Sequence, residues 1–118
     1  MQPNRTERPW GFYDVHFTHH PKVKLKTLTV MPGKKLSMQK HESRAEYWFV
    51  AEGVASIYTI DDNTQEKTLF AHYPEHEQAW IARNVWHQLC NEQEVPLFIV
   101  EIQYGDLCVE EDIIRRDA

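Results

Sequence analysis

The sequence is short of the features that mark several classes of protein. None of its apolar runs approaches the ~20 residues that a membrane-spanning helix needs, and its polar N-terminus lacks the pattern of a secretory signal peptide. Acidic residues outnumber basic ones by 18 to 13, so the formal net charge of -5 gives no general electrostatic reason for binding nucleic acid. We therefore expect a cytoplasmic protein that has neither a membrane nor a nucleic acid as its partner.

Cysteine is also scarce. Only Cys90 and Cys108 are present, and they lack the spacing of a CxxC motif. Without a secretory signal, free thiols in a reducing cytosol are the expected state rather than a disulfide. The 118 residues are enough for one hydrophobic core, which predicts a single domain over residues 1–118.

No long segment has the period of an amphipathic helix. Short β-rich runs separated by turn residues follow one another instead, at 12–17, 22–30, 35–40, 47–50, 54–60, 67–73, 79–82, 86–91 and 96–104. Residues 1–10 are expected to form an irregular arm, and residues 110–116 either a short helix or an extended end. Many short strands at roughly 8–12-residue spacing predict an all-β sandwich or jelly-roll barrel, which can enclose an interior pocket.

The segment from Gly33 to Gly53 carries residues that could hold a metal ion. Gln39 and His41 lie two positions apart, so on a strand their side chains point to the same face. Glu46 follows after a short polar link, and we place it in the loop after that strand. An amide oxygen, an imidazole and a carboxylate make most of a metal site, and His87 is the candidate for the missing ligand.

These residues resemble the two motifs of the cupin superfamily. The first motif is matched by glycines flanking the three candidate ligands, and Gln39 stands where a histidine is usual. The end of the second motif is matched by His87 and Asn91. Ala82 and Asn84 replace its usual proline and glycine, and asparagine tolerates the left-handed backbone that a glycine would adopt.

A narrower resemblance covers most of the chain. The C-terminal isomerase domain of type II mannose-6-phosphate isomerases is similar in motifs that follow one another in the same order: Arg8-Pro9-Trp10-Gly11, Lys24-Leu25-Lys26, Pro32-Gly33, Leu36-Ser37-Met38-Gln39-x-His41, Arg44-Ala45-Glu46-x-Trp48 and Glu111-Asp112-Ile113-Ile114-Arg115. Glu42 and Ser43 depart from it, because histidines are common there. The guanylyltransferase domain that often precedes this domain is absent here, which implies a stand-alone isomerase-like cupin.

The resemblance implies a cupin-type jelly-roll barrel that interconverts mannose 6-phosphate and fructose 6-phosphate with one divalent metal ion. Zinc suits the ligand set, while manganese, iron and nickel are alternatives. The implied roles are metal ligation by Gln39, His41, Glu46 and His87, catalysis by Arg115 and Lys24, and substrate binding by Lys26, Arg44 and Trp48. A homodimer formed through N-terminal strands is also implied.

Three alternatives stay open at this point. The lysines at 22, 24 and 26 share one strand face, which is either the solvent-exposed face of a sheet or a phosphate-binding surface. The protein is either an isomerase or a non-catalytic cupin that binds a sugar or sugar nucleotide. A metal-dependent dioxygenase, which the same fold can host, is a third class, but it usually uses more histidines than this set contains.

Overall fold

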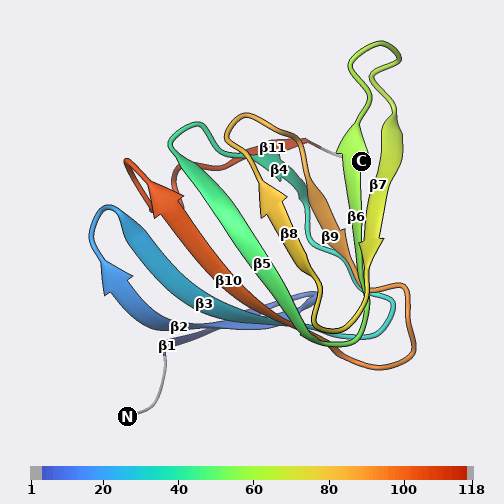
Figure 1. Cartoon of the computed structure of the whole chain (residues 1–118), viewed down its shortest axis with the longest axis horizontal. Coiled ribbons are helices and arrows are strands. Elements are labelled where there is room, and N and C mark those ends of the chain that lie inside the picture. The colour runs from blue at the N-terminus through green and yellow to red at the C-terminus, as the bar shows by residue number, and fades with distance from the viewer. Residues whose placement is uncertain (1–3, 117–118) are drawn as a thin grey trace.

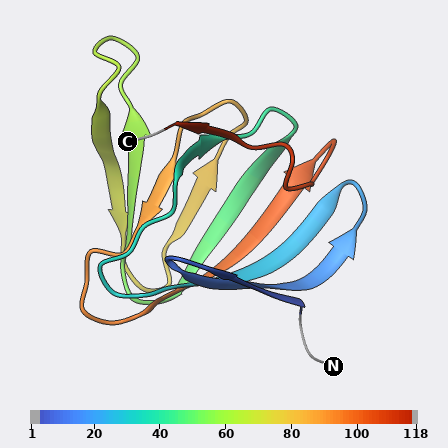
Figure 2. The same cartoon turned by 180° about the vertical axis from the view of Figure 1, so that it is seen from behind.

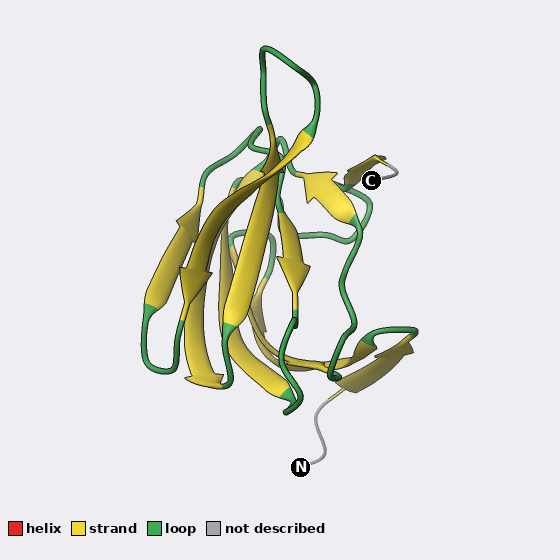
Figure 3. Ribbon diagram, turned by 90° about the vertical axis from the view of Figure 1, so that its right-hand side faces the viewer, coloured by secondary structure: helices red, strands yellow, loops and turns green. Residues whose placement is uncertain are grey.

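The computed structural model describes residues 4–116, and this part of the chain consists of β-strands joined by turns, with no segment coloured as a helix (Figure 3). The strands are β1 (Asn4–Arg8), β2 (Gly11–His19), β3 (Val23–Val30), β4 (Met38–Lys40), β5 (Arg44–Glu52), β6 (Ala55–Ile60), β7 (Lys67–Tyr73), β8 (Gln78–Ile81), β9 (Gln88–Cys90), β10 (Leu97–Gly105) and β11 (Ile114–Arg116). The predicted all-β class is confirmed. Among the described residues, no helix has the length and apolar character that a membrane crossing requires.

The strands form two layers of a jelly roll. One layer is a six-stranded antiparallel sheet in the order β1-β2-β3-β10-β5-β8, which fans across the molecule in Figure 1. The other contains β7-β6-β9 and the pair β11-β4, which Figure 2 shows from behind. Isolated bridges from Lys35 to Cys90 and from Gln39 to His87 join the two parts of this second layer. Segments far apart in the sequence therefore meet on one wall.

The barrel interior changes from apolar to polar along the three central strands. In the register of β3, β10 and β5, Ile99 of β10 lies between Leu28 and Val50. One step further along, Glu101 lies between Lys26 and Trp48, and all of these side chains are buried. Residues two apart on a strand face the same side, so each strand contributes to both the core and the polar end. The apolar end supplies the hydrophobic stabilisation, and the polar end holds the candidate site.

The structure corrects two predictions about the N-terminal third of the chain. The arm predicted at residues 1–10 is a strand from Asn4 to Arg8, which pairs with β2 at the edge of the large sheet, while residues 1–3 lie outside the described part. On β3, the face that carries Lys24 and Lys26 continues into Leu28 and is the interior face. Lys26 is only 4% exposed, so the interpretation of this face as solvent-exposed is wrong for Lys26.

The other strands lie close to their predicted ranges. Residues 67–73 match β7, and the tail takes the extended alternative, with β11 paired to β4. β5 begins at Arg44, so Glu46 is a strand residue rather than the loop residue that we predicted. Cys90 and Cys108 are both buried and free, in agreement with the expectation of reduced thiols.

Candidate metal centre and its cavity

Three buried side chains from three places in the chain converge at the polar end of the barrel. His41 follows β4, Glu46 lies on β5, and His87 directly precedes β9. The Nε2 of His41 lies 3.5 Å from Glu46 Oε2, and the Nε2 of His87 lies 3.3 Å from Glu46 Oε1. One potential ligand atom from each residue lies within 4.8 Å of the others. This spacing allows one small cation to contact all three.

Both imidazole rings are oriented by backbone carbonyl groups. Nδ1 of His41 donates a hydrogen bond of 2.7 Å to the carbonyl of Asp112, and Nδ1 of His87 donates one of 2.9 Å to that of Val85. A carbonyl can only accept, so Nδ1 carries a proton in each ring, whether or not Nε2 is also protonated. Each Nε2 therefore faces Glu46, and a hydrogen bond from the other ring nitrogen to a carbonyl is how proteins commonly orient metal-binding histidines. The donor set and its orientation fit a divalent metal ion.

The charges around Glu46 keep its carboxylate ionised. Burial by itself would raise the pKa of Glu46, but the hydrogen bond from His87 and the charges of His87, His41 and Arg44 outweigh it and lower that pKa to about 2. Burial lowers the pKa of His41, and the positive charge of Arg44 acts in the same direction. A neutral His41 has a lone pair on Nε2 for a metal ion.

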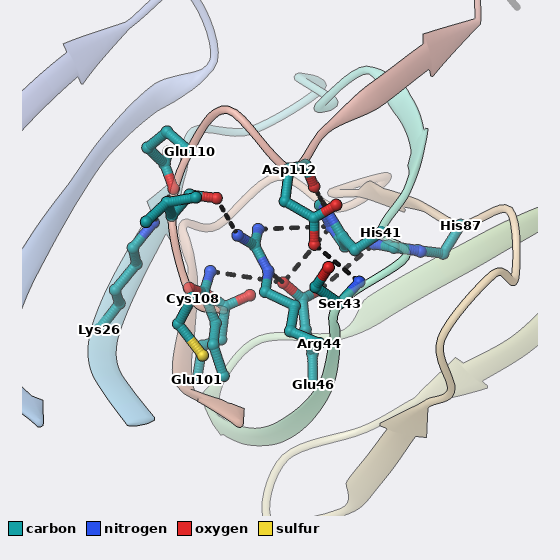
Figure 4. A network of polar contacts seen from close by, with 12 residues as sticks. Lys26, His41, Ser43, Arg44, Glu46, His87, Glu101, Cys108, Glu110 and Asp112 are labelled. Atoms are coloured by element: carbon teal, nitrogen blue, oxygen red, sulfur yellow. Dashed lines mark hydrogen bonds and ion pairs between the residues drawn. The ribbon is translucent and has the colours of Figure 1, made fainter. Parts of the chain in front are cut away.

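Arg44, predicted to bind substrate, is buried and forms an ion pair within the ligand cluster (Figure 4). Its Nε lies 3.3 Å from Glu46 Oε2, its Nη2 lies 3.4 Å from His41 Nε2, and its Nη1 donates to the carbonyl of Val109. Arg44 also lines the cavity described below. One oxygen of the Glu46 carboxylate, Oε2, thus contacts the guanidinium of Arg44, and the other, Oε1, contacts His87.

Gln39, the fourth predicted ligand, is adjacent to this cluster. Its backbone pairs with that of His87, and its side chain lines the same cavity. The Nε2 of Gln39 donates to Ser37 Oγ at 3.1 Å, which leaves the amide oxygen, the atom that would bind a metal, outside that hydrogen bond. The structure therefore brings all four predicted ligand residues to one end of the barrel.

A cavity of about 220 Å³ extends from the cluster into the barrel. Its wall combines apolar, cationic and carboxylate side chains. The lining includes Arg8, Lys26, Arg44, Glu46, Trp48, His87, Glu101, Gln103, Glu110 and Arg115. Of the two predicted catalytic residues, Arg115 on β11 lines this cavity and is exposed, whereas Lys24 is absent from its described lining. Lys24 lies two positions before Lys26, nearer the start of β3, so sharing a face was not enough to bring it into the cavity.

The two other predicted substrate-binding residues are held by carboxylates in the cavity wall. Lys26 Nζ donates to Glu110 Oε2 at 3.0 Å and lies 4.2 Å from the ring centroid of Tyr13. Trp48 donates from Nε1 to Glu101 Oε2 at 2.7 Å. Both side chains line the cavity, but their polar atoms already have protein partners.

Sequence reasoning missed several polar residues of this wall. Glu101 and Gln103 lie in the β-rich run at 96–104, and Arg8 and Glu110 lie in the segments that we predicted as an irregular arm and as a short helix or extended end. One signal was available. The buried face of β10 reads Leu97, Ile99, Glu101 and Gln103, so its alternation places two polar residues on the core side.

The altered second motif keeps its predicted backbone conformation. Asn84 has a φ of 61°, in the left-handed region where we expected it to replace a glycine. Its backbone N–H donates to the carbonyl of His41 at 2.8 Å. This turn therefore connects the second motif to the first at a ligand residue.

Comparisons with known proteins agree with this architecture. A family model described as mannose-6-phosphate isomerase C-terminal matches residues 2–118. The chain is 39% identical over 110 residues to alginate biosynthesis protein AlgA of Pseudomonas aeruginosa, covering 93% of this chain and 21% of that protein. It is 37% identical over 108 residues to mannose-1-phosphate guanylyltransferase of Escherichia coli, covering 92% and 21%. The chain thus spans about a fifth of the length of these relatives.

Among solved structures, the capsular polysaccharide assembling protein CapF of Staphylococcus aureus superposes with a TM-score of 0.84. The match covers 100% of this chain and 33% of CapF at 12% sequence identity, so it is a likeness in fold alone. Together with the two-layered strand arrangement, it confirms the predicted cupin-type jelly-roll barrel.

Proposed function

This chain belongs to the family of mannose-6-phosphate isomerase C-terminal domains, and from that premise we propose that it is a metal-dependent isomerase that interconverts mannose 6-phosphate and fructose 6-phosphate. The observation that carries the proposal is the His41–Glu46–His87 cluster beside a polar cavity with cationic side chains. An aldose–ketose isomerisation needs these two elements together, since charge develops on the sugar oxygens and the phosphate must be held.

His41, Glu46 and His87, with the amide oxygen of Gln39, would hold the ion in this proposal. Nitrogen and oxygen donors of this kind suit zinc, and manganese, iron or nickel is compatible with the same set. A divalent ion bound there supplies Lewis-acid stabilisation for negative charge on the substrate oxygens. The buried position of the three ligand residues keeps bulk water away from that charge.

The proposed phosphate site lies at the arginines of the cavity. Arg8 on β1 and Arg115 on β11 are exposed and line the cavity, so their charges are accessible to an entering anion. The charge of Lys26, in contrast, is paired with Glu110. Arginine binds phosphate oxygens with two N–H groups at once, which favours Arg8 and Arg115 over the buried lysine.

The test uses protein freed of metal by a chelator and reloaded with zinc or manganese. We expect interconversion of the two phosphosugars by the reloaded protein, and its loss in His87→Gln. His16→Gln, which changes an exposed histidine on β2, is the matched control and retains activity. Metal-loaded wild-type protein that converts no member of a phosphosugar panel would overturn the proposal.

A second candidate is a cupin that binds a sugar or sugar nucleotide without turnover. The contacts of Arg44 favour this candidate. Its guanidinium lies against His41 Nε2 and Glu46 Oε2, so it competes with a metal ion for the same two ligand atoms. Calorimetry distinguishes the two candidates. Tight binding of mannose 6-phosphate or a mannose nucleotide without conversion would establish this candidate in place of the isomerase.

The setting of the reaction is part of the same proposal. Phosphosugar metabolism and two buried free thiols are both compatible with the cytoplasm. The homodimer expected through N-terminal strands stays a prediction. β1 lies at the edge of the six-stranded sheet, where a second copy could pair with it, and light scattering on the purified protein measures the assembly.

A further inference from the structure

A second buried carboxylate, separate from the ligand cluster, lies in the wall of the same cavity. Glu101 on β10 is 4% exposed and is held by two N–H donors. Trp48 Nε1 donates to its Oε2 at 2.7 Å, and Gln103 Nε2 donates to its Oε1 at 3.1 Å. These bonds leave the carboxylate little freedom to turn, so its position relative to the cavity is fixed before any ligand binds.

Gln103 connects this carboxylate to the ligand cluster. Its Nε2 lies 3.1 Å from Glu101 Oε1 and 3.4 Å from Glu46 Oε2, so one amide group spaces the two acidic side chains. The Oε1 of Gln103 is buried without a hydrogen-bond partner among the described residues. An unpaired buried acceptor costs free energy.

The surroundings of Glu101 suit a group that exchanges a proton. Burial and the negative charge of Glu46 raise the pKa of Glu101 to about 7, against the opposing charges of Lys26 and Arg44 and the hydrogen bond from Trp48. A buried carboxyl group that lines the cavity and has its pKa near neutrality can both accept and donate a proton there.

We propose that Glu101 is the acid–base residue that moves the proton between the two reacting carbons of the phosphosugar, an inference that rests on the proposed isomerase function. The Glu101 carboxylate takes the proton from C2 of the aldose. The C–H electron pair forms the C1–C2 double bond, and the carbonyl pair moves onto O1. Glu101 then returns the proton to C1 while O2 loses its proton to O1 and becomes the carbonyl. No electrons are gained or lost overall.

Trp48 and Gln103 are positioning residues in this scheme. They touch Glu101 rather than the reacting atoms, and their N–H groups hold its oxygens. Neither residue can itself act as a base, because an indole N–H is only a donor and an amide does not titrate in this range. Of the side chains that line the cavity, Glu101 combines a carboxylate fixed by two hydrogen bonds with a pKa of about 7, close to neutral pH.

The experiment measures binding and turnover separately in Glu101→Gln, which keeps the size of the side chain and one acceptor oxygen. We expect unchanged metal content and a Kd for mannose 6-phosphate within about threefold of wild type, whereas kcat falls by roughly 10²–10⁴-fold. Glu101→Asp keeps the carboxyl group but shortens it, so it should retain part of the turnover with a shifted pH profile. Glu94→Gln, in an exposed loop, is the matched control.

The outcomes separate this inference from the proposed function. If wild type isomerises the sugar and Glu101→Gln, folded and metal-loaded, keeps kcat within about threefold, Glu101 is not the acid–base residue and the isomerase assignment stands. If metal-loaded wild type converts no phosphosugar, both proposals fail. If Glu101→Gln does not fold, Glu101→Asp decides, since an unchanged kcat and pH profile in that variant would overturn the proposal.

Discussion

Gln39 and His87 exchange both of their backbone hydrogen bonds, each N–H donating to the other's carbonyl at 2.9 Å. This single bridge places the first histidine-containing motif beside the second on one wall of the barrel. Because the backbones of two candidate ligand residues are hydrogen-bonded to each other, the positions of their side chains are restricted. The candidate metal site is therefore assembled by strand pairing before any ion binds.

Metal binding to this preformed site should stabilise the fold. With free zinc at about 1,000 times its Kd, linkage predicts a gain of about 4 kcal/mol, or roughly 15 °C in Tm for a domain of this size. Differential scanning calorimetry of chelator-treated and zinc-loaded protein measures the shift. His87→Gln should lose most of it and the exposed control His16→Gln should keep it. An equal shift in both variants would place the ion elsewhere.

The buried pair of Arg44 and Glu46 should behave as a unit. Glu46→Leu leaves the Arg44 guanidinium buried without its carboxylate and should cost about 3–5 kcal/mol of unfolding free energy. Adding Arg44→Met removes the unpaired charge and should recover most of that loss. Urea unfolding of the two single variants and the double variant in a chelator tests the coupling. Simple additivity of the two losses would show that the pair is not coupled.

The left-handed turn at Asn84 should tolerate glycine but not a β-branched residue. Asn84→Gly is expected within about 0.5 kcal/mol of wild type, whereas Asn84→Val should cost roughly 1–2 kcal/mol. Weaker zinc binding should accompany the valine, because Asn84 N–H holds the carbonyl of His41. Ala82→Val, in the same exposed loop, controls for added bulk. Equal stability of the glycine and valine variants would contradict this account.

The raised pKa of Glu101 makes a prediction about stability that does not depend on activity. A carboxyl group whose pKa rises from its ordinary value of 4.5 to about 7 on folding binds more protons in the folded state between these values. Its contribution therefore disappears as pH rises through that window. In metal-free protein, Glu101→Gln should gain stability relative to wild type between pH 5 and pH 8, by up to about 3 kcal/mol.

Urea unfolding at the two pH values measures this difference, and Glu94→Gln serves as the exposed control for loss of a carboxylate. A constant difference between Glu101→Gln and wild type from pH 5 to pH 8 would show that the carboxyl group does not change its protonation in this range.

The predicted ligand residues were recoverable from the sequence because spacing on a strand is local information. Side chains two positions apart on a strand point to one face, which is why Gln39 and His41 were predicted to act together. In the structure Gln39 lines the cavity with Glu46 and His87, and His41 directly follows β4. His87 could be assigned only through its resemblance to the second cupin motif, because no pattern of spacing within a strand connects it to Glu46. The assignment of Glu46 to a loop failed because short polar segments and strand starts look alike in sequence.

Other features of the interior could not be predicted from the sequence because this barrel is polar at one end. Lysine on a strand ordinarily marks the solvent face, yet Lys26 lies inside beside Glu110. Glu101 was hidden in an apolar run for the same reason. A buried charge is affordable only with a partner, and those partners come from strands that are distant in the sequence.

By itself, the sequence determined the strand-rich class, the turn at Asn84 and the set of residues with metal-binding chemistry, since these depend on local alternation, backbone preference and side-chain donors. Only the tertiary structure decided which residues face one another. It paired Arg44 with Glu46, placed Glu101 between Lys26 and Trp48, and kept Lys24 out of the cavity lining. The physical reason is register, because each of these neighbours is set by long-range strand pairing that no short window of sequence contains.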